Sequence, residues 1–349
     1  MKNSDEKIKN FQKYLKLQKI QAFAVMDYDS LNYLSDFHFS TQKDALLLIT
    51  QTKAFCFTKE LYAINLRKAA PYLTLIISLN PADIVKKVKE LKIKNAAFDP
   101  ELISYIPGNM FKKAGFIEMT GEISKLREVK LPSEISKIQK ACQISAKAYE
   151  IFRKKLKAGI TEIEAAKMLE EIMFSLGGQG LAFETIMAFG SDGANPHHVN
   201  SKRKLKNNEP VLMDYGCKYG DYCSDITRAF WYGGKPSKEF TKIYDIVKSA
   251  HDITLKSAKI AMSGNELDAV CRNYIEEKSG LSKHFIHSTG HSLGIAIHEA
   301  PFVRINSADI LRENSVFTIE PGLYFEGKLG VRYENTVLLT KTGAKILTK

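Results

Sequence analysis

The fold class of the second half of this chain is decided by the stretch Val316-Phe-Thr-Ile-Glu-Pro-Gly-Leu-Tyr-Phe-Glu-Gly-Lys-Leu-Gly-Val-Arg-Tyr-Glu-Asn-Thr-Val-Leu-Leu339. Two runs in it, 316–319 and 331–339, are short and rich in aliphatic and β-branched residues, which is typical of strands. The glycines between the runs favour tight turns. Because strands joined by tight turns pair in the antiparallel sense, this region predicts an antiparallel sheet.

The same pattern extends upstream from this stretch. Further strand-like runs lie at 183–189, 210–214 and 225–231. Helical patterns interrupt them, and Thr161 with Glu164 forms a capping-box signature for one helix. The expected helices span 133–157, 161–176, 237–261 and 265–278. The second half is therefore expected to be a curved antiparallel sheet flanked by helices.

The first half has a different pattern. Up to about residue 121, short helical segments alternate with short buried runs such as 45–49 and 54–57, which suggests an α/β domain. It holds one histidine and no cluster of ligand-type residues. A polar segment then leads to Pro132, where a long helix can begin. We expect an α/β chain of two domains, 1–123 and 124–349.

Composition limits the class of protein. The chain has 349 residues, 44% hydrophobic and 26% charged, as in soluble globular proteins, and its longest apolar run, 72–79, is too short to span a bilayer. The first residues mix both charge signs, so no secretory signal is expected. Five scattered cysteines without a C-x-x-C pair argue against a zinc ribbon or a disulfide framework and favour the cytoplasm.

The net charge of +12 comes from 51 basic against 39 acidic residues. Lysine is spread along the chain rather than gathered in a stripe, so neither a nucleic-acid nor a membrane partner is expected.

Four acids occupy positions where strands usually carry aliphatic residues: Asp214, Asp225, Glu320 and Glu334. A carboxylate on a half-buried strand is costly unless it is paired, hydrogen-bonded or bound to a metal. Seven of the eight histidines also follow residue 190. Together these residues favour a shared cation site, although strand periodicity does not show whether they converge. An oxygen-rich set with one imidazole suits Mn²⁺ or a related divalent ion, and two such ions would support hydrolysis.

The residues also carry a resemblance. The second half resembles the metallopeptidases that include aminopeptidase P, prolidase, methionine aminopeptidase and creatinase, which share the pita-bread fold. The matching motifs are Met213-Asp-Tyr-Gly, Cys223-Ser-Asp-Ile-Thr-Arg, Thr289-Gly-His-Ser-Leu-Gly-Ile-Ala-Ile-His-Glu-Ala-Pro, Thr318-Ile-Glu-Pro-Gly-Leu-Tyr and Gly330-Val-Arg-Tyr-Glu-Asn-Thr-Val. The first half is similar to the prolidase N-terminal domain only in length and αβ character.

The resemblance implies a site with two divalent ions, with Mn²⁺ favoured over Co²⁺ or Zn²⁺. Asp225 and Glu334 would bridge the ions, and Glu320 would also act as general base. The implied metal ligands are Asp214, Asp225, His291, Glu320 and Glu334.

Four further residues have roles implied by the same resemblance. His298 would bind substrate or stabilise the tetrahedral intermediate, and His197 would lie near the scissile bond. His287 would contact the substrate around proline, and Arg332 would buttress the cluster.

Other residues near these motifs are expected to be less important. Tyr324 and Phe183 are candidates for pocket lining, and Ser292 replaces a glycine that is common in the family. We expect His198 to lie in an exposed loop, and Asp192, Glu299 and Glu326 to be solvated.

We therefore expect an Xaa-Pro aminopeptidase that acts on peptides with proline in second position, and a homodimer, which is common among relatives. The alternative within the family is a prolidase, which cleaves only dipeptides and for which Arg304 would read the substrate carboxylate. From another class, the alternative is a pita-bread protein that binds a partner without catalysis. Creatinase-like chemistry is less favoured than any of these.

Overall fold

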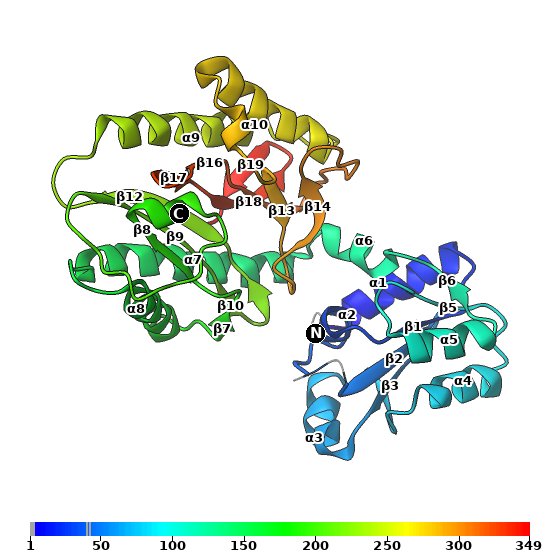
Figure 1. Ribbon diagram of the computed structural model, residues 1–349. Helices are drawn as coiled ribbons and strands as arrows, with labels where there is room; N and C mark the ends of the chain where they lie inside the picture. Colours follow the sequence, from blue (N-terminus) through cyan, green and yellow to red (C-terminus); the bar gives the residue numbers. More distant parts are fainter. Residues whose placement is uncertain (1–3, 40, 42) are drawn as a thin grey trace. The chain divides into compact units, whose positions relative to one another are not determined.

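The computed structural model describes residues 4–39, 41 and 43–349, and it divides between Leu126 and Arg127 into two compact units (Figure 1). The first residues of the chain, on which the absence of a secretory signal was predicted, lie partly outside the described residues. Each unit is described by itself below.

The first unit is built on a mixed six-stranded sheet in the order β4-β3-β2-β1-β5-β6. Strand β1 pairs antiparallel with β2 and parallel with β5, so helices connect the parallel strands, as the alternating pattern predicts. Its strands are β1 Ala22–Val25, β2 Ala45–Thr50, β3 Ala54–Thr58, β4 Thr74–Ile77, β5 Ala96–Phe98 and β6 Ile117–Glu118. Its helices are α1 Ser4–Leu17, α2 Tyr28–Ser35, α3 Glu60–Ala69, α4 Pro81–Glu90 and α5 Tyr105–Lys113; α6, Glu122–Glu128, contains the division.

Helices of the second unit cover its strands on two sides. The cluster of α7 and α8 packs on β8, β9 and β12, whereas α9 and α10 pack on β16 and β17 (Figure 1). Pro132 occupies the first turn of α7, and the predicted capping box of Thr161 and Glu164 starts α8. The helical bounds are α7 Pro132–Lys155, α8 Glu162–Ser175, η1 Gly190–Ala194, α9 Lys238–Ser257, α10 Gly264–Ser279 and η2 Ser282–His284.

All strand pairs within the second unit are antiparallel in the described residues. The sheets run β11-β10-β7, β12-β9-β8 and β14-β13-β15-β18-β19, and β16 pairs with β17 in a hairpin. The strands are β7 Gly180–Leu181, β8 Ile186–Phe189, β9 Glu209–Tyr215, β10 Cys217–Tyr219, β11 Tyr222–Cys223, β12 Ile226–Tyr232, β13 Gly290–Ser292, β14 Glu299–Val303, β15 Val316–Ile319, β16 Gly322–Phe325, β17 Leu329–Arg332, β18 Asn335–Thr340 and β19 Gly343–Ile346. The expected fold class is confirmed.

One expected strand is divided in two. The run 331–339 is interrupted at Tyr333 and Glu334, because the chain changes partners there: β17 pairs with β16, and β18 pairs with β15. The backbone N–H of Glu334 instead donates to the carbonyl of Thr227 at 3.2 Å. Glu334 therefore takes part in neither strand pair, and its side chain is buried within the unit.

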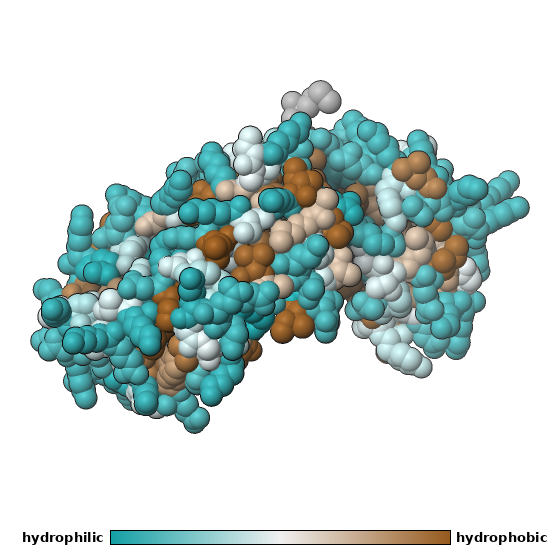
Figure 2. Space-filling view, turned by 90° about the horizontal axis from the view of Figure 1, so that it is seen from above, coloured by the Kyte–Doolittle hydropathy of each residue, from teal (hydrophilic) through white to brown (hydrophobic). Residues whose placement is uncertain are grey.

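The face of the molecule drawn in Figure 2 is mostly hydrophilic, as a lysine-rich surface requires. Among the described residues, no helix combines the length and the apolar character that crossing a membrane demands.

Candidate metal centre

A cavity of about 1010 Å³ lies in the second unit and collects the predicted site residues from segments that are far apart in sequence. Its lining includes Asp214, Asp225, His291, Glu320 and Glu334, together with His197, His287, His298 and Arg332. The structure therefore brings all nine predicted residues to one place, which strand periodicity alone did not establish.

The acids meet because two strands are in register. Asp214 on β9 lies opposite Thr227 on β12, and Asp225 directly precedes β12. The Thr227 hydroxyl donates to Glu334 Oε2 at 2.6 Å and so links β12 to the break between β17 and β18. Thr227 is a residue that sequence reasoning missed. Its signal was its position two residues after Asp225, which places both side chains on one face of an extended strand.

His291 presents a lone pair to the acids. Its Nδ1 lies 3.1 Å from the carbonyl of Ser292, and since a carbonyl only accepts, Nδ1 carries the proton. Burial lowers the pKa of His291, which keeps the ring neutral. Its Nε2 then faces Asp225 Oδ2 at 3.6 Å and Glu320 Oε1 at 3.4 Å without a proton to share. A nitrogen lone pair among carboxylate oxygens fits a cation between them.

The acids themselves also fit a cation. Burial, followed by the charge of Glu334, raises the pKa of Asp225, and burial with the charges of Glu320 and Asp214 raises the pKa of Glu334. Burial likewise raises the pKa of Glu320 to about 7. Among the described residues, buried Asp214 Oδ1 and Asp225 Oδ1 have no hydrogen-bond partner.

One ligand atom each from Asp225, His291 and Glu334 lie within 4.8 Å of one another. A mutually repelling oxygen-rich set with one imidazole suits divalent ions of the Mn²⁺ type.

Arg332 balances part of this negative charge. Its guanidinium donates to Asp214 Oδ2 at 2.5 Å, to Thr227 Oγ1 at 2.9 Å and to the Tyr324 hydroxyl at 2.7 Å. The Tyr324 hydroxyl lies 2.8 Å from Nε2 of His287, whose Nδ1 lies 2.8 Å from the carbonyl of Ser288. Burial, then the charge of Arg332, lowers the pKa of His287 to about 3. The network therefore holds His287 neutral beside Glu320.

Two predicted histidines lie on the solvent side of the cavity. The ring of His298 lies 4.4 Å from the ring of His291, centroid to centroid, and is exposed. His197 is exposed as well, and it lines the same cavity as Glu320 and His298. Both rings are placed to contact a molecule that enters the cavity.

Two expectations from the sequence are wrong. Glu299, expected to be solvated, is buried and pairs with Arg127 Nη2 at 2.5 Å and with Lys130 Nζ at 3.2 Å. Burial alone would raise the pKa of Glu299, but the two cations lower it. His198, expected in an exposed loop, is largely buried against Glu162. In both cases the partner lies far away in sequence.

Lys130 also donates to the hydroxyl of Ser292 at 3.3 Å, and Ser292 donates to the carbonyl of Val316 at 2.7 Å. The serine that departs from the family pattern thus has a buried partner. Because Glu299 follows His298 and Ser292 follows His291, this ion network fixes the two segments that carry both histidines.

Glu299→Gln should destabilise the fold by about 3–5 kcal/mol, because it removes the carboxylate that the buried cations Arg127 and Lys130 share. Lys130→Met should cost less, since Glu299 would keep Arg127. Exposed Glu277→Gln is the control, with a change within about 0.5 kcal/mol. Urea unfolding of the three variants measures these free energies. An equal loss in Lys130→Met and Glu299→Gln would show that the excess positive charge is unimportant.

Comparison with known families matches two models. The model "Metallopeptidase family M24" matches residues 136–341, and "Creatinase/Prolidase N-terminal domain" matches residues 7–129. Among curated proteins, an uncharacterized peptidase of Staphylococcus aureus (strain USA300) is 38% identical over 271 residues, which cover 78% of this chain and 75% of that protein.

Solved structures are similar over the whole chain. The Xaa-Pro dipeptidase from Bacillus anthracis has a TM-score of 0.92 and 33% identity, covering 99% of this chain and 98% of that one. The X-Pro aminopeptidase from Thermotoga maritima MSB8 has a TM-score of 0.90 and 34% identity, covering 98% and 97%.

Proposed function

The chain belongs to metallopeptidase family M24, and from this premise we propose that it hydrolyses the peptide bond before proline and releases the N-terminal residue. The observation that carries the proposal is the convergence of five ligand-type side chains and three histidines in one cavity. The solved structures named above, a dipeptidase and an aminopeptidase for Xaa-Pro bonds, support the same substrate class.

Asp214, Asp225, His291, Glu320 and Glu334 would hold two divalent ions, for which we propose Mn²⁺ on the chemistry of the donor set. When bound, such ions acidify a water molecule and polarise a carbonyl oxygen. The partnerless oxygens of Asp214 and Asp225 and the lone pair of His291 support this assignment.

The chain's own groups would then position the substrate and move the proton. Glu320 carries a proton from the attacking water to the nitrogen of the leaving proline. His298 and His197, at the solvent side, donate to the oxygen on which negative charge develops. His287, kept neutral by burial and Arg332, contacts the substrate near proline. An X–Pro bond lacks an N–H, so recognition rests on shape and on these side chains.

The size of the cavity favours an aminopeptidase over a dipeptidase. About 1010 Å³ is at the upper end of the volumes of small-molecule pockets and leaves room beyond a dipeptide.

The alternative, a dipeptidase, depends on Arg304. Arg304 lies at the same cavity, exposed, with its guanidinium 4.7 Å from the ring of Phe302. A dipeptidase would need such a cation to bind the proline carboxylate.

With Mn²⁺ added, we expect Xaa-Pro-Xaa peptides to be cleaved with a kcat/KM at least about tenfold above that of Xaa-Pro, since one decade corresponds to only ~1.4 kcal/mol. Arg304→Leu should weaken cleavage of the dipeptide alone. Mass spectrometry of the products after chelation and restoration with Mn²⁺, Co²⁺ or Zn²⁺ measures both. Cleavage restricted to dipeptides would establish a dipeptidase. Failure to cleave with any of the metals would favour the non-catalytic binding protein.

Two further proposals concern the setting of the protein. We propose a cytoplasmic location, which is supported by five buried cysteine thiols. We also propose a homodimer, which rests on the family resemblance.

A further inference from the structure

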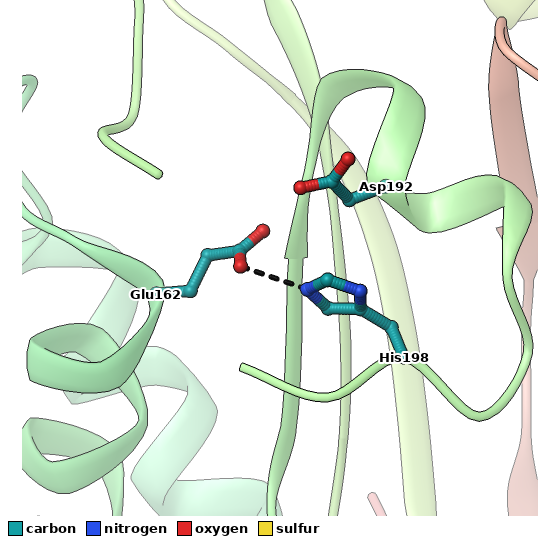
Figure 3. Close-up of side chains that lie close together, drawn as sticks. All are labelled: Glu162, Asp192 and His198. Atoms are coloured by element: carbon teal, nitrogen blue, oxygen red, sulfur yellow. Dashed lines mark hydrogen bonds and ion pairs between the residues drawn. The ribbon is translucent and has the colours of Figure 1, made fainter. Parts of the chain in front are cut away.

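A second group of ligand-type side chains lies apart from the five carboxylate and histidine ligands. Glu162, Asp192 and His198 each offer an atom within 4.8 Å of the others, and Figure 3 shows them converging from α8, from η1 and from the loop that follows it. The loop matters because His198 directly follows His197, which faces the cavity.

The hydrogen bonds of Glu162 favour a structural role for this side chain over that of a metal ligand. Its side chain has no exposed surface, and Oε2 accepts from the N–H of Ser201 at 2.9 Å and from the Ser201 hydroxyl at 2.7 Å. Its Oε1 accepts from the N–H of Phe189 at 2.9 Å. Asp192 instead pairs with Arg203 Nη1 at 3.4 Å. Hydrogen-bond donors therefore reach both oxygens of Glu162. We call the pair of Glu162 and His198 the clamp, because it holds the loop after η1 against α8.

His198 completes the clamp. Its Nε2 lies 2.7 Å from Glu162 Oε2, the contact drawn in Figure 3. A carboxylate only accepts, so Nε2 must carry the proton and donate it. On the other side of His197, the side chain of Asn195 accepts from the N–H of His197 at 3.1 Å. The Asn195 contact is a local turn, whereas the His198 contact ties the loop to α8 immediately after His197.

His197 and His198 have different environments. His198 turns back onto the buried carboxylate, with 12% of its side chain exposed. His197 is exposed and lines the cavity together with Glu320 and His287. The contact that holds the His198 ring therefore also restrains the backbone next to His197.

We propose that Glu162 and His198 are positioning residues, which clamp the loop so that His197 is presented to the substrate; this role rests on the proposed function. The clamp removes alternative conformations of an exposed loop before substrate binds. Misplacing a group by about 1 Å can cost a reaction about 100-fold, so a lost clamp should show mainly in kcat.

The main variants are Glu162→Gln and His198→Leu, measured on an Xaa-Pro-Xaa peptide with Mn²⁺. We expect kcat to fall about 10- to 100-fold, with KM within about threefold of the unchanged protein. His198→Gln keeps an N–H donor at similar reach and should restore most of the activity. Glu164→Gln is the matched control, because Glu164 lies in the same first turn of α8 but is exposed.

A double-mutant cycle with His197→Ala separates positioning from simple structural damage. If the clamp acts through His197, His198→Leu should have little further effect once His197 is absent. An independent readout is the imidazole ¹H–¹³C NMR spectrum, in which the His197 signal should broaden or shift in Glu162→Gln while the signals of His251 and His284 stay in place.

Each outcome has one meaning. Additive losses in the cycle, or an unchanged His197 signal, would overturn the clamp even if the protein cleaves the peptide. If the unchanged protein lacks activity, the proposed function fails, and the NMR comparison still decides whether Glu162 holds His197.

Discussion

Glu334→Gln is expected to lower kcat/KM by more than about 100-fold, a loss beyond that typical of residues that only support metal ligands. The amide keeps the shape of the side chain and can still accept from Thr227. It removes the charge that would bridge two ions. At the same time it removes one of several buried acids that repel one another, so the metal-free variant should be at least as stable as the metal-free parent.

Two measurements check this prediction together: peptide cleavage with Mn²⁺ and thermal unfolding in a chelator. Exposed Glu326→Gln, from the turn between β16 and β17, is the control and should change neither. Full activity in Glu334→Gln would remove it from the ligand set. Inactivity together with a much lower melting temperature would instead indicate a structural role.

Chelation is expected to abolish activity and to lower the melting temperature, and the stabilisation regained with Mn²⁺ should grow as pH rises. At one hundred times Kd, an ion that binds only the folded state adds about 2.7 kcal/mol. Asp225, Glu320 and Glu334 have raised pKa values in the metal-free protein, so they bind protons up to a higher pH than usual and the ion competes with those protons. Metal affinity should therefore fall as pH drops below 7.

The same groups also determine how the free energy of unfolding of the metal-free protein changes with pH. The pKa of Glu320 is about 7 in the folded protein against 4.5 as its ordinary value, so the folded state binds more protons between these values and loses stability as pH rises through them. Buried His251, whose pKa is lowered to about 4, acts in the opposite sense. Comparing melting temperatures with and without Mn²⁺ from pH 5 to 8 removes its contribution. A metal-induced shift that is independent of pH would contradict the assignment.

The fold could be predicted largely because its signals are local. Pro132 and the Thr161–Glu164 capping box predict α7 and α8, and the alternation of helices and short buried runs predicts the first unit. The interruption at Glu334 could not be foreseen, because an aliphatic run reads as one strand whether or not its partner changes halfway along. Only the positions of β15 and β16 determine that change.

The candidate site divides in a similar way. Acids on strands are unusual by themselves, so Asp214 and Asp225 could be found from the sequence. Glu299 and His198 were misjudged because the burial of each depends on partners distant in the sequence. Glu299 pairs with Arg127 and Lys130, and His198 pairs with Glu162. A single sequence shows a charged residue but not the opposite charge that makes its burial tolerable.

The buried pairing of Arg127 and Lys130 with Glu299 also bears on how the gene can be divided. Pro132, the visible start of the long helix, suggests a truncation just upstream of it. Such a fragment would lack both cations and would enclose an uncompensated carboxylate, so it should accumulate as insoluble material on expression. A fragment intended to fold would have to begin before Arg127.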